Sequence, residues 1–130
     1  MEQSAFGLML RKLRESRGFS LRELAQLADV DHAYVYRLET GAKEAPSDDV
    51  VTKLARALKA SRRDAEILRY LGQRANAKAG LVEFALENST LTAVEFAGLD
   101  GMAHRGTVRH DYKTLLERMR RILGEEDGAG

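Results

Sequence analysis

The sequence predicts a mostly α-helical protein, and three observations support this. Apolar residues recur every three or four positions through most of the 130 residues, which is the spacing of one face of an α-helix. Proline occurs only once, so few segments are barred from helical structure. Ser or Thr followed three residues later by Glu or Asp marks several positions where a helix can begin.

Three helices with tight connections are predicted in the first third of the chain. The first covers residues 6–16, and Gly18 suits its C-terminal end. Ser20 and Glu23 form a capping box that opens the second helix. The connection at 29–31 is so short that the second and third helices must meet at a steep angle.

Two further helices complete an N-terminal domain, which we place at residues 1–72. Gly41 ends the third helix, because glycine readily adopts the left-handed conformation found after a helix. Ser47 caps the fourth helix, and Ser61 with Asp64 marks the start of the fifth.

The apolar pattern weakens after this domain, and residues 73–124 are predicted to form a smaller, mainly helical module. Both helices and strands are compatible with the pattern over 80–106. Thr92 followed by Glu95 resembles another capping box. The three glycines within 98–106 predict a loop there.

A final helix is predicted from about residue 108 to residue 123, and the acidic, glycine-rich tail, 125–130, is expected to be disordered. The apolar positions of this helix form one stripe, consisting of Val108, Tyr112, Leu115, Leu116, Met119, Ile122 and Leu123. Such a stripe lies either in the core of its own chain or in the seam of a dimer. We assign a dimerisation role to all of these residues except the last.

Three short runs in the first half of the chain agree with a known family in both residue type and spacing. They are Ser20-Leu21-Arg22-Glu23-Leu24-Ala25, the turn Asp29-Val30, and Tyr36-Arg37-Leu38-Glu39-Thr40-Gly41. Through them, residues 6–58 resemble the phage-repressor (Xre/Cro-type) helix-turn-helix transcriptional regulators. The resemblance implies a five-helix, repressor-like helix-turn-helix domain, followed by a C-terminal dimerisation module. It also implies an ion pair between Arg14 and Glu39 that ties the first helix to the end of the third.

The resemblance makes the third helix a recognition helix, whose outer face enters the major groove of DNA. His32, Ala33, Tyr36 and Arg37 fall on one side of this helix. Arg37 is expected to contact guanine through two hydrogen bonds, which discriminate against other bases by about 1–3 kcal/mol. His32 is expected at a base edge, Ala33 against a thymine methyl group, and Tyr36 at a base or a phosphate.

Three further residues complete the expected DNA-binding set. Arg22 takes the phosphate contact for which the family often has Gln one position earlier. Tyr34 is expected to touch the DNA backbone, and Lys43 lies in the loop after the third helix. Packing between core and solvent is the alternative role for Tyr34 and Tyr36, because tyrosine serves both environments.

We expect a cytoplasmic transcriptional regulator, specifically a repressor, that binds a pseudo-palindromic operator on double-stranded DNA as a homodimer. The net charge of +1 is too small for binding by attraction alone, so affinity should depend on fit and on dimerisation. One helix-turn-helix domain covers one half-site, and half-sites lie about 34–36 Å apart, so a second copy is needed. The alternative is an antitoxin or adaptor whose C-terminal half binds a protein partner while DNA binding autoregulates its operon.

No enzymatic activity, cofactor or metal site is expected. The sequence contains no phosphate-binding loop, no cysteine and no Ser-His-Asp arrangement. His104 and His110 lie in a glycine-rich setting without the spacing of metal ligands.

No stretch is long enough to cross a bilayer, and the lack of cysteine fits a reduced compartment. A basic helix face is interpreted as solvated surface rather than as a second DNA contact, and it comprises Arg62, Arg63, Arg69 and Arg74.

Overall fold

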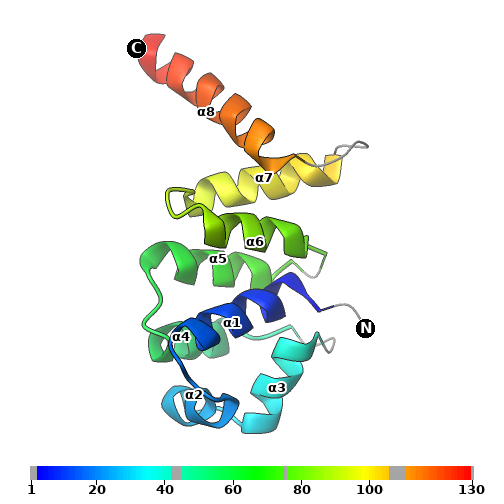
Figure 1. Cartoon of the computed structure of the whole chain (residues 1–130), viewed down its shortest axis with the longest axis vertical. Helices are drawn as coiled ribbons and strands as arrows, with labels where there is room; N and C mark the ends of the chain where they lie inside the picture. The colour runs from blue at the N-terminus through cyan, green and yellow to red at the C-terminus, as the bar shows by residue number, and fades with distance from the viewer. Residues whose placement is uncertain (1–2, 42–44, 75, 106–110, 130) are drawn as a thin grey trace.

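The computed structural model describes residues 3–41, 45–74, 76–105 and 111–129. These residues form eight α-helices and no strand (Figure 1). The helices are α1 (Ala5–Ser16), α2 (Leu21–Ala28), α3 (His32–Thr40), α4 (Asp48–Ala57), α5 (Arg62–Gly72), α6 (Ala79–Glu87), α7 (Ala93–Arg105) and α8 (Tyr112–Ala129). None of the helices in this described part is long and apolar enough to span a membrane.

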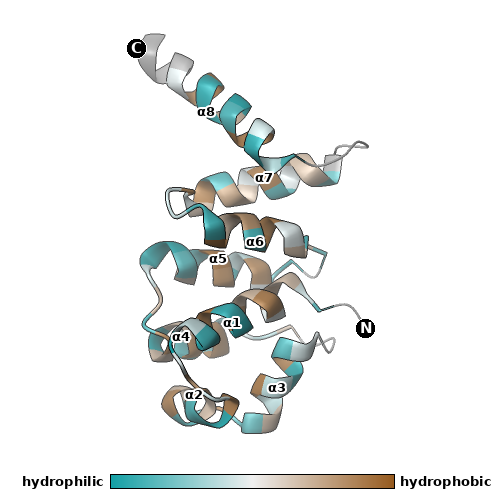
Figure 2. Cartoon of the chain, in the orientation of Figure 1, coloured by the Kyte–Doolittle hydropathy of each residue, from teal (hydrophilic) through white to brown (hydrophobic). Residues whose placement is uncertain are grey.

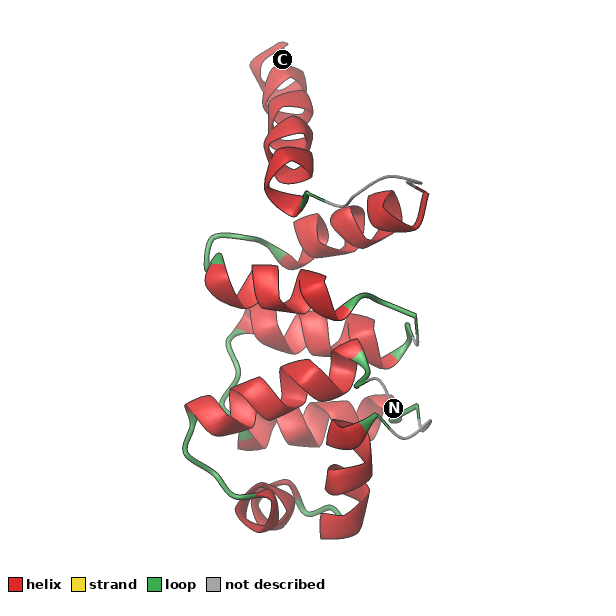
Figure 3. Ribbon diagram, turned by 45° about the vertical axis from the view of Figure 1, so that its right-hand side comes forward, coloured by secondary structure: helices red, strands yellow, loops and turns green. Residues whose placement is uncertain are grey.

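The helices form an elongated stack with α2 and α3 at one end and α8 at the other (Figures 1 and 3). α1 packs on α3, α5 and α6, and α4 packs on α2 and α5. α7 then covers α5 and α6, and α8 lies against α7. Hydrophobic segments gather where α5, α6 and α7 face one another, whereas much of α8 is hydrophilic (Figure 2). One cluster of buried apolar residues extends from α1 to α8, across the predicted domain boundary at residue 72.

The helix starts predicted at Ser20, Ser47, Ser61 and Thr92 are confirmed. The Ser20 hydroxyl accepts a hydrogen bond from the Glu23 amide at 3.0 Å, and the Glu23 carboxylate accepts one from the Ser20 amide at 2.9 Å. Thr92 and Glu95 form an equivalent capping box before α7. Ser47 and Ser61 also cap α4 and α5 through their hydroxyl groups. Each cap satisfies amide groups that the first helical turn leaves without partners.

The prediction of a loop at the glycines of 98–106 was wrong for Gly98 and Gly101, because α7 continues to Arg105, and Gly106 lies outside the described residues. Gly98 faces a neighbouring helix rather than forming a turn. A Cβ atom added there would lie 2.8 Å from Cε of Met119 on α8. The missing side chain therefore lets α8 approach α7 closely. The described part of 80–106, which was compatible with strands, contains α6, a short turn at 88–92 and α7.

The last helix differs from its prediction at both ends. It begins at Tyr112, after Asp111, whose carboxylate accepts from the Thr114 amide and hydroxyl. Val108 lies outside the described residues. At the other end the backbone is helical to Ala129, where a disordered tail was expected, because extending an existing helix costs far less than nucleating one.

Arg63 has an internal role that differs from the solvated surface expected of it. Its Nη1 atom donates to the backbone carbonyls of Ala85 at 3.0 Å, Asn88 at 2.9 Å and Leu91 at 3.2 Å. These carbonyls lie at the end of α6 and in the connection to α7. One side chain of α5 thus holds the turn on which the C-terminal helices depend.

A polar contact also joins α5 to α7. The Tyr70 hydroxyl donates to Oδ2 of Asp100, a carboxylate that is almost fully buried. His104 on the next turn of α7 places Nε2 3.1 Å from the other carboxylate oxygen. Burial, together with the hydrogen bond to Asp100, raises the pKa of Tyr70 to about 12. Tyr70 therefore stays protonated and serves as a permanent donor to the buried carboxylate.

Candidate DNA-binding surface

A tight turn sets the angle between α2 and α3. Asp29 adopts the left-handed conformation (φ 56°, ψ 49°) and ends α2. The Val30 amide then donates to the Ala25 carbonyl at 3.0 Å, and the Asp31 carboxylate accepts from the Tyr34 amide at 3.2 Å and caps α3. Asp is one of the few residues besides glycine that enters the left-handed region readily. Three residues therefore suffice to end one helix and start the next.

α3 has a buried inner face and an exposed outer face. Val35 and Leu38 are almost fully buried against the core. The four residues predicted to meet the bases lie on the solvent-exposed side of the helix, and these are His32, Ala33, Tyr36 and Arg37. The structure therefore brings these four side chains together on one face at the end of the molecule.

Tyr34 occupies an intermediate position beside this face. It is half-buried, and the guanidinium carbon of Arg37 lies 5.6 Å from the centre of its ring. A cation held over an aromatic face loses part of its rotational freedom before any ligand arrives. Tyr34 thus both packs against the core and orients Arg37.

Arg22 extends this surface onto α2. It is exposed and lines a shallow open groove with Gln26, Asp29, Asp31 and His32. Gln26 was missed by the sequence reasoning, although its spacing of four residues from Arg22 places both on one helix face. Lys43, the remaining predicted contact, lies outside the described residues.

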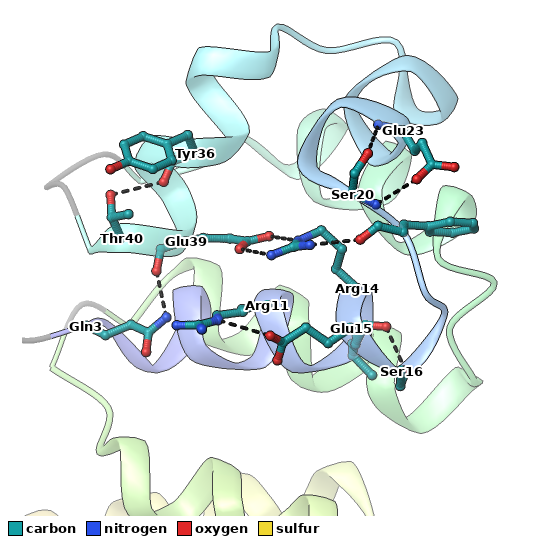
Figure 4. A network of polar contacts seen from close by, with 12 residues as sticks. Gln3, Arg11, Arg14, Glu15, Ser16, Ser20, Glu23, Tyr36, Glu39 and Thr40 are labelled. Carbon is teal, nitrogen blue, oxygen red and sulfur yellow. Dashed lines mark hydrogen bonds and ion pairs between the residues drawn. The ribbon is translucent and has the colours of Figure 1, made fainter.

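A buried ion pair fixes α3 to α1 (Figure 4). Nε and Nη2 of Arg14 donate to the two carboxylate oxygens of Glu39 at 2.7 and 3.0 Å. Nη1 of Arg14 donates to the Phe19 carbonyl at 2.8 Å. The side chains of Arg14 and Glu39 are only 15% and 5% exposed, and the hydrogen bonds to Glu39 raise the pKa of Arg14. The pair implied by the resemblance is present and joins the end of α3 to α1.

Two further contacts join the N-terminal end of α1 to α3. The Gln3 side-chain amide donates to the Glu39 carbonyl at 2.7 Å (Figure 4). Gly7 faces the carbonyl oxygens of Leu38 and Glu39 so closely that an added Cβ atom would collide with both. Sequence reasoning missed Gly7, because a glycine inside a helix does not reveal which backbone lies beside it.

The other three arginines of the predicted basic face are exposed, as expected, and each also has a contact within the chain. Arg62 pairs with Glu66 one turn away at 3.2 Å, and Arg74 lies over the Tyr70 ring at 5.2 Å. Arg69 reaches Thr52 at 3.5 Å. Within the described ranges, no group of three or more His, Cys, Asp or Glu residues is placed to hold a metal ion. The exposed outer face of α3, extended by Arg22 on α2, is therefore the best candidate site.

Comparisons with known proteins agree with this geometry. Residues 5–68 match a family described as a helix-turn-helix domain. A 55-residue stretch is 40% identical to the HTH-type transcriptional repressor RghR of Bacillus subtilis (strain 168), which amounts to 42% of this chain and 41% of the relative. The chain thus spans about two fifths of the length of this curated relative, and no solved structure matches. Residues 5–68 are therefore a helix-turn-helix domain.

Proposed function

We propose that this protein is a sequence-specific DNA-binding transcriptional regulator that inserts α3 into the major groove. The observation that carries the proposal is the outer face of α3, on which Arg37 and its three neighbours are exposed at the end of the molecule. A helix can reach base edges only if it protrudes and if its apolar residues face inward. Both conditions hold for α3.

Each exposed residue has a role that fits its chemistry. Arg37, oriented by Tyr34, matches the two acceptors that guanine presents in the major groove. His32 suits a base edge, Ala33 a thymine methyl group, and Tyr36 a base or a phosphate. Arg22 on α2 supplies a phosphate contact, which positions the domain without reading sequence.

We further propose that the protein acts as a homodimeric repressor on a pseudo-palindromic operator. A single α3 reads one half-site, and a two-fold symmetric pair reads two half-sites with the same residues. The name of the curated relative, a transcriptional repressor, supports the direction of regulation. Occupying an operator is a sufficient mechanism for repression, because it requires no contact beyond those that bind DNA.

Selection from randomised DNA duplexes tests this proposal. We expect the wild-type chain to enrich a two-fold symmetric sequence and Arg37→Ala to lose the preference for guanine at one position in each half. Arg62→Ala is the matched control, because Arg62 is an equally charged, highly exposed residue on α5. Failure to enrich any sequence, or an unchanged preference in Arg37→Ala, would contradict the proposal.

A further inference from the structure

A groove lies at the junction between the helix-turn-helix domain and the helices that follow it. Its volume is about 1120 Å³, which is large enough for a small molecule. The start of α1, the end of α3 and the connection from α5 to α6 lie on the same side of the molecule (Figures 1 and 3), and residues of all three line the groove. It is separate from the shallow groove beside Arg22 on the proposed DNA-binding surface.

The floor of the groove is apolar. Phe6 of α1, Leu38 of α3 and Leu71 of α5 line it, and all three are buried. Gly72 adds no side chain to this floor, although a Cβ atom there would meet Cγ of Pro46 at 3.6 Å and Cε2 of Phe6 at 3.8 Å. A hydrocarbon body gains free energy when it leaves water for such a surface.

The exposed rim of the groove carries charge. Arg74 and Lys78 line it from the connection between α5 and α6, and both are exposed. Arg74 is partly oriented, because its guanidinium carbon lies 5.2 Å from the centre of the Tyr70 ring. Glu83 is the one acidic side chain among the described residues that line the groove. A net positive rim above an apolar floor is complementary to a molecule with an anionic head and an apolar body.

The groove also includes residues that position α3. Gln3 lines it, and the side-chain amide of Gln3 donates to the Glu39 carbonyl at 2.7 Å. Gly41 lines it too, and ends α3 in the left-handed conformation (φ 86°). A ligand that contacts the end of α3 and the start of α6 together binds best to one position of α3. Its affinity is therefore linked to that position.

We propose that this groove binds a small amphipathic carboxylate, which acts as an effector of DNA binding. The apolar floor takes the hydrocarbon body, and Arg74 and Lys78 bind the carboxylate. The effector role rests on the proposed function, whereas the binding of the carboxylate does not. If the ligand changes the affinity for the operator, the operator changes the affinity for the ligand by the same factor.

Titration of the full chain with sodium octanoate, without DNA, tests the site. We expect saturable shifts of the backbone amide NMR signals of Gly41, Gly72 and Ala77, which line the groove, while the signals of α8 stay in place. The dissociation constant should be on the order of 1 mM for so small a ligand. Octan-1-ol has the same hydrocarbon chain without the charge and should bind at least about threefold more weakly. A titration that does not saturate by about 20 mM octanoate would overturn the proposal.

Charge variants test the role of the rim. Arg74→Gln and Lys78→Gln should each weaken octanoate binding by about three- to tenfold. Arg62→Gln is the matched control, since Arg62 is an exposed arginine of α5 that does not line the groove. A folded Arg74→Gln, Lys78→Gln double variant that binds octanoate as the wild type does would also overturn the proposal.

A variant that fills the groove tests its position. Ala79 is the first residue of α6 and lines the groove, so Ala79→Leu should abolish saturable octanoate binding. Ala93→Leu is the matched control, because Ala93 is the first residue of α7 and lies outside the groove. Circular dichroism confirms that both variants keep their helices. Binding that survives in a folded Ala79→Leu protein would place the ligand elsewhere.

Operator affinity with and without saturating octanoate tests the effector role, with sodium chloride at the same concentration as the control for salt. We expect at least an about threefold change for the wild type and none for Ala79→Leu. Unchanged wild-type affinity would overturn the effector role. None of these results bears on the DNA-binding proposal, which is tested without octanoate through Arg37→Ala.

Discussion

The first five helices and the helix that follows them, α6, begin in different ways. Each of α1 to α5 begins with a side-chain oxygen that accepts a hydrogen bond from the first turn, supplied by Ser4, Ser20, Asp31, Ser47 and Ser61. α6 has Lys78 at the corresponding position and no side-chain cap. Its far end is held instead by Arg63 of α5. Local signals therefore start α1 to α5, and also α7 and α8, whereas a contact from α5 holds the end of α6.

The two regions also differ in what their close contacts do. Among the first five helices, Gly7 and the Arg14–Glu39 pair hold α3 against α1 and so set the position of the proposed recognition helix. In the C-terminal region, Gly98 admits the flexible end of Met119, which can move if it is displaced. We infer that the binding surface is held rigidly and that the α7–α8 contact tolerates adjustment.

The largest expected effect is the loss of stability when the buried Arg14–Glu39 pair is broken, compared with the loss when an exposed ion pair on α1 is broken. Arg14→Ala leaves the Glu39 carboxylate buried without its partner, so the free energy of unfolding should fall by about 3 kcal/mol. Arg11→Ala removes an exposed pair with Glu15 and should change it by less than about 0.5 kcal/mol. Urea unfolding monitored by circular dichroism measures both. Equal losses in the two variants would mean that the buried pair does not hold the domain together.

Alanine at two helical glycines compares the two regions directly. Gly7→Ala places a methyl group against backbone carbonyls that cannot move aside, so it should destabilise the protein by about 2 kcal/mol. Gly98→Ala places its methyl group only against the end of the Met119 side chain, and alanine favours a helix more than glycine does. The free energy of unfolding should therefore fall by less than about 1 kcal/mol. Thermal unfolding ranks the two. A greater loss for Gly98→Ala would reverse the proposed contrast in rigidity.

A smaller effect concerns the pH dependence of the α7–α8 contact. The hydrogen bond from Arg120 is the main cause that lowers the pKa of Glu95 from its ordinary value of 4.5. Because the pKa is lower in the folded state, this carboxylate stabilises the fold at pH values above 4.5, and the contribution is lost as the pH falls through the lowered value. We expect less than about 1 kcal/mol, since Arg120 is partly exposed.

Amide hydrogen exchange in α8 at neutral and acidic pH measures this loss. Protection of α8 should decrease on acidification in the wild type, beyond the change seen in α4. Glu95→Gln cannot titrate and should remove that extra decrease. The same pH response in both proteins would assign it to another group.

The sequence predicted what depends on neighbouring residues and failed where distant residues decide. The capping boxes at Ser20 and Thr92 and the short turn at Asp29 are local patterns, and the structure contains them. The helix through Gly98 was missed because glycine was interpreted as a turn residue, whereas the side chain that it faces, Met119, lies 21 residues further along the sequence. The Arg14–Glu39 pair was available only through the family resemblance. No local pattern links two residues 25 positions apart.

In the candidate site, too, the local pattern was predicted and a contact between side chains was not. Helical periodicity alone placed His32, Ala33, Tyr36 and Arg37 on one face, which the structure shows. The position of Arg37 over the Tyr34 ring could not be predicted, because it depends on side-chain rotamers rather than on spacing.

The central claim is that Arg37 reads sequence from the exposed face of α3. The most direct measurement compares the affinity of wild-type and Arg37→Ala proteins for the selected operator and for a duplex with one guanine replaced in each half. We predict that the wild type prefers the operator by about ten- to a hundredfold per half-site, as expected for a bidentate arginine–guanine contact, and that Arg37→Ala loses this preference while remaining folded. An Arg37→Ala protein that still discriminates between the two duplexes as well as the wild type would contradict the claim.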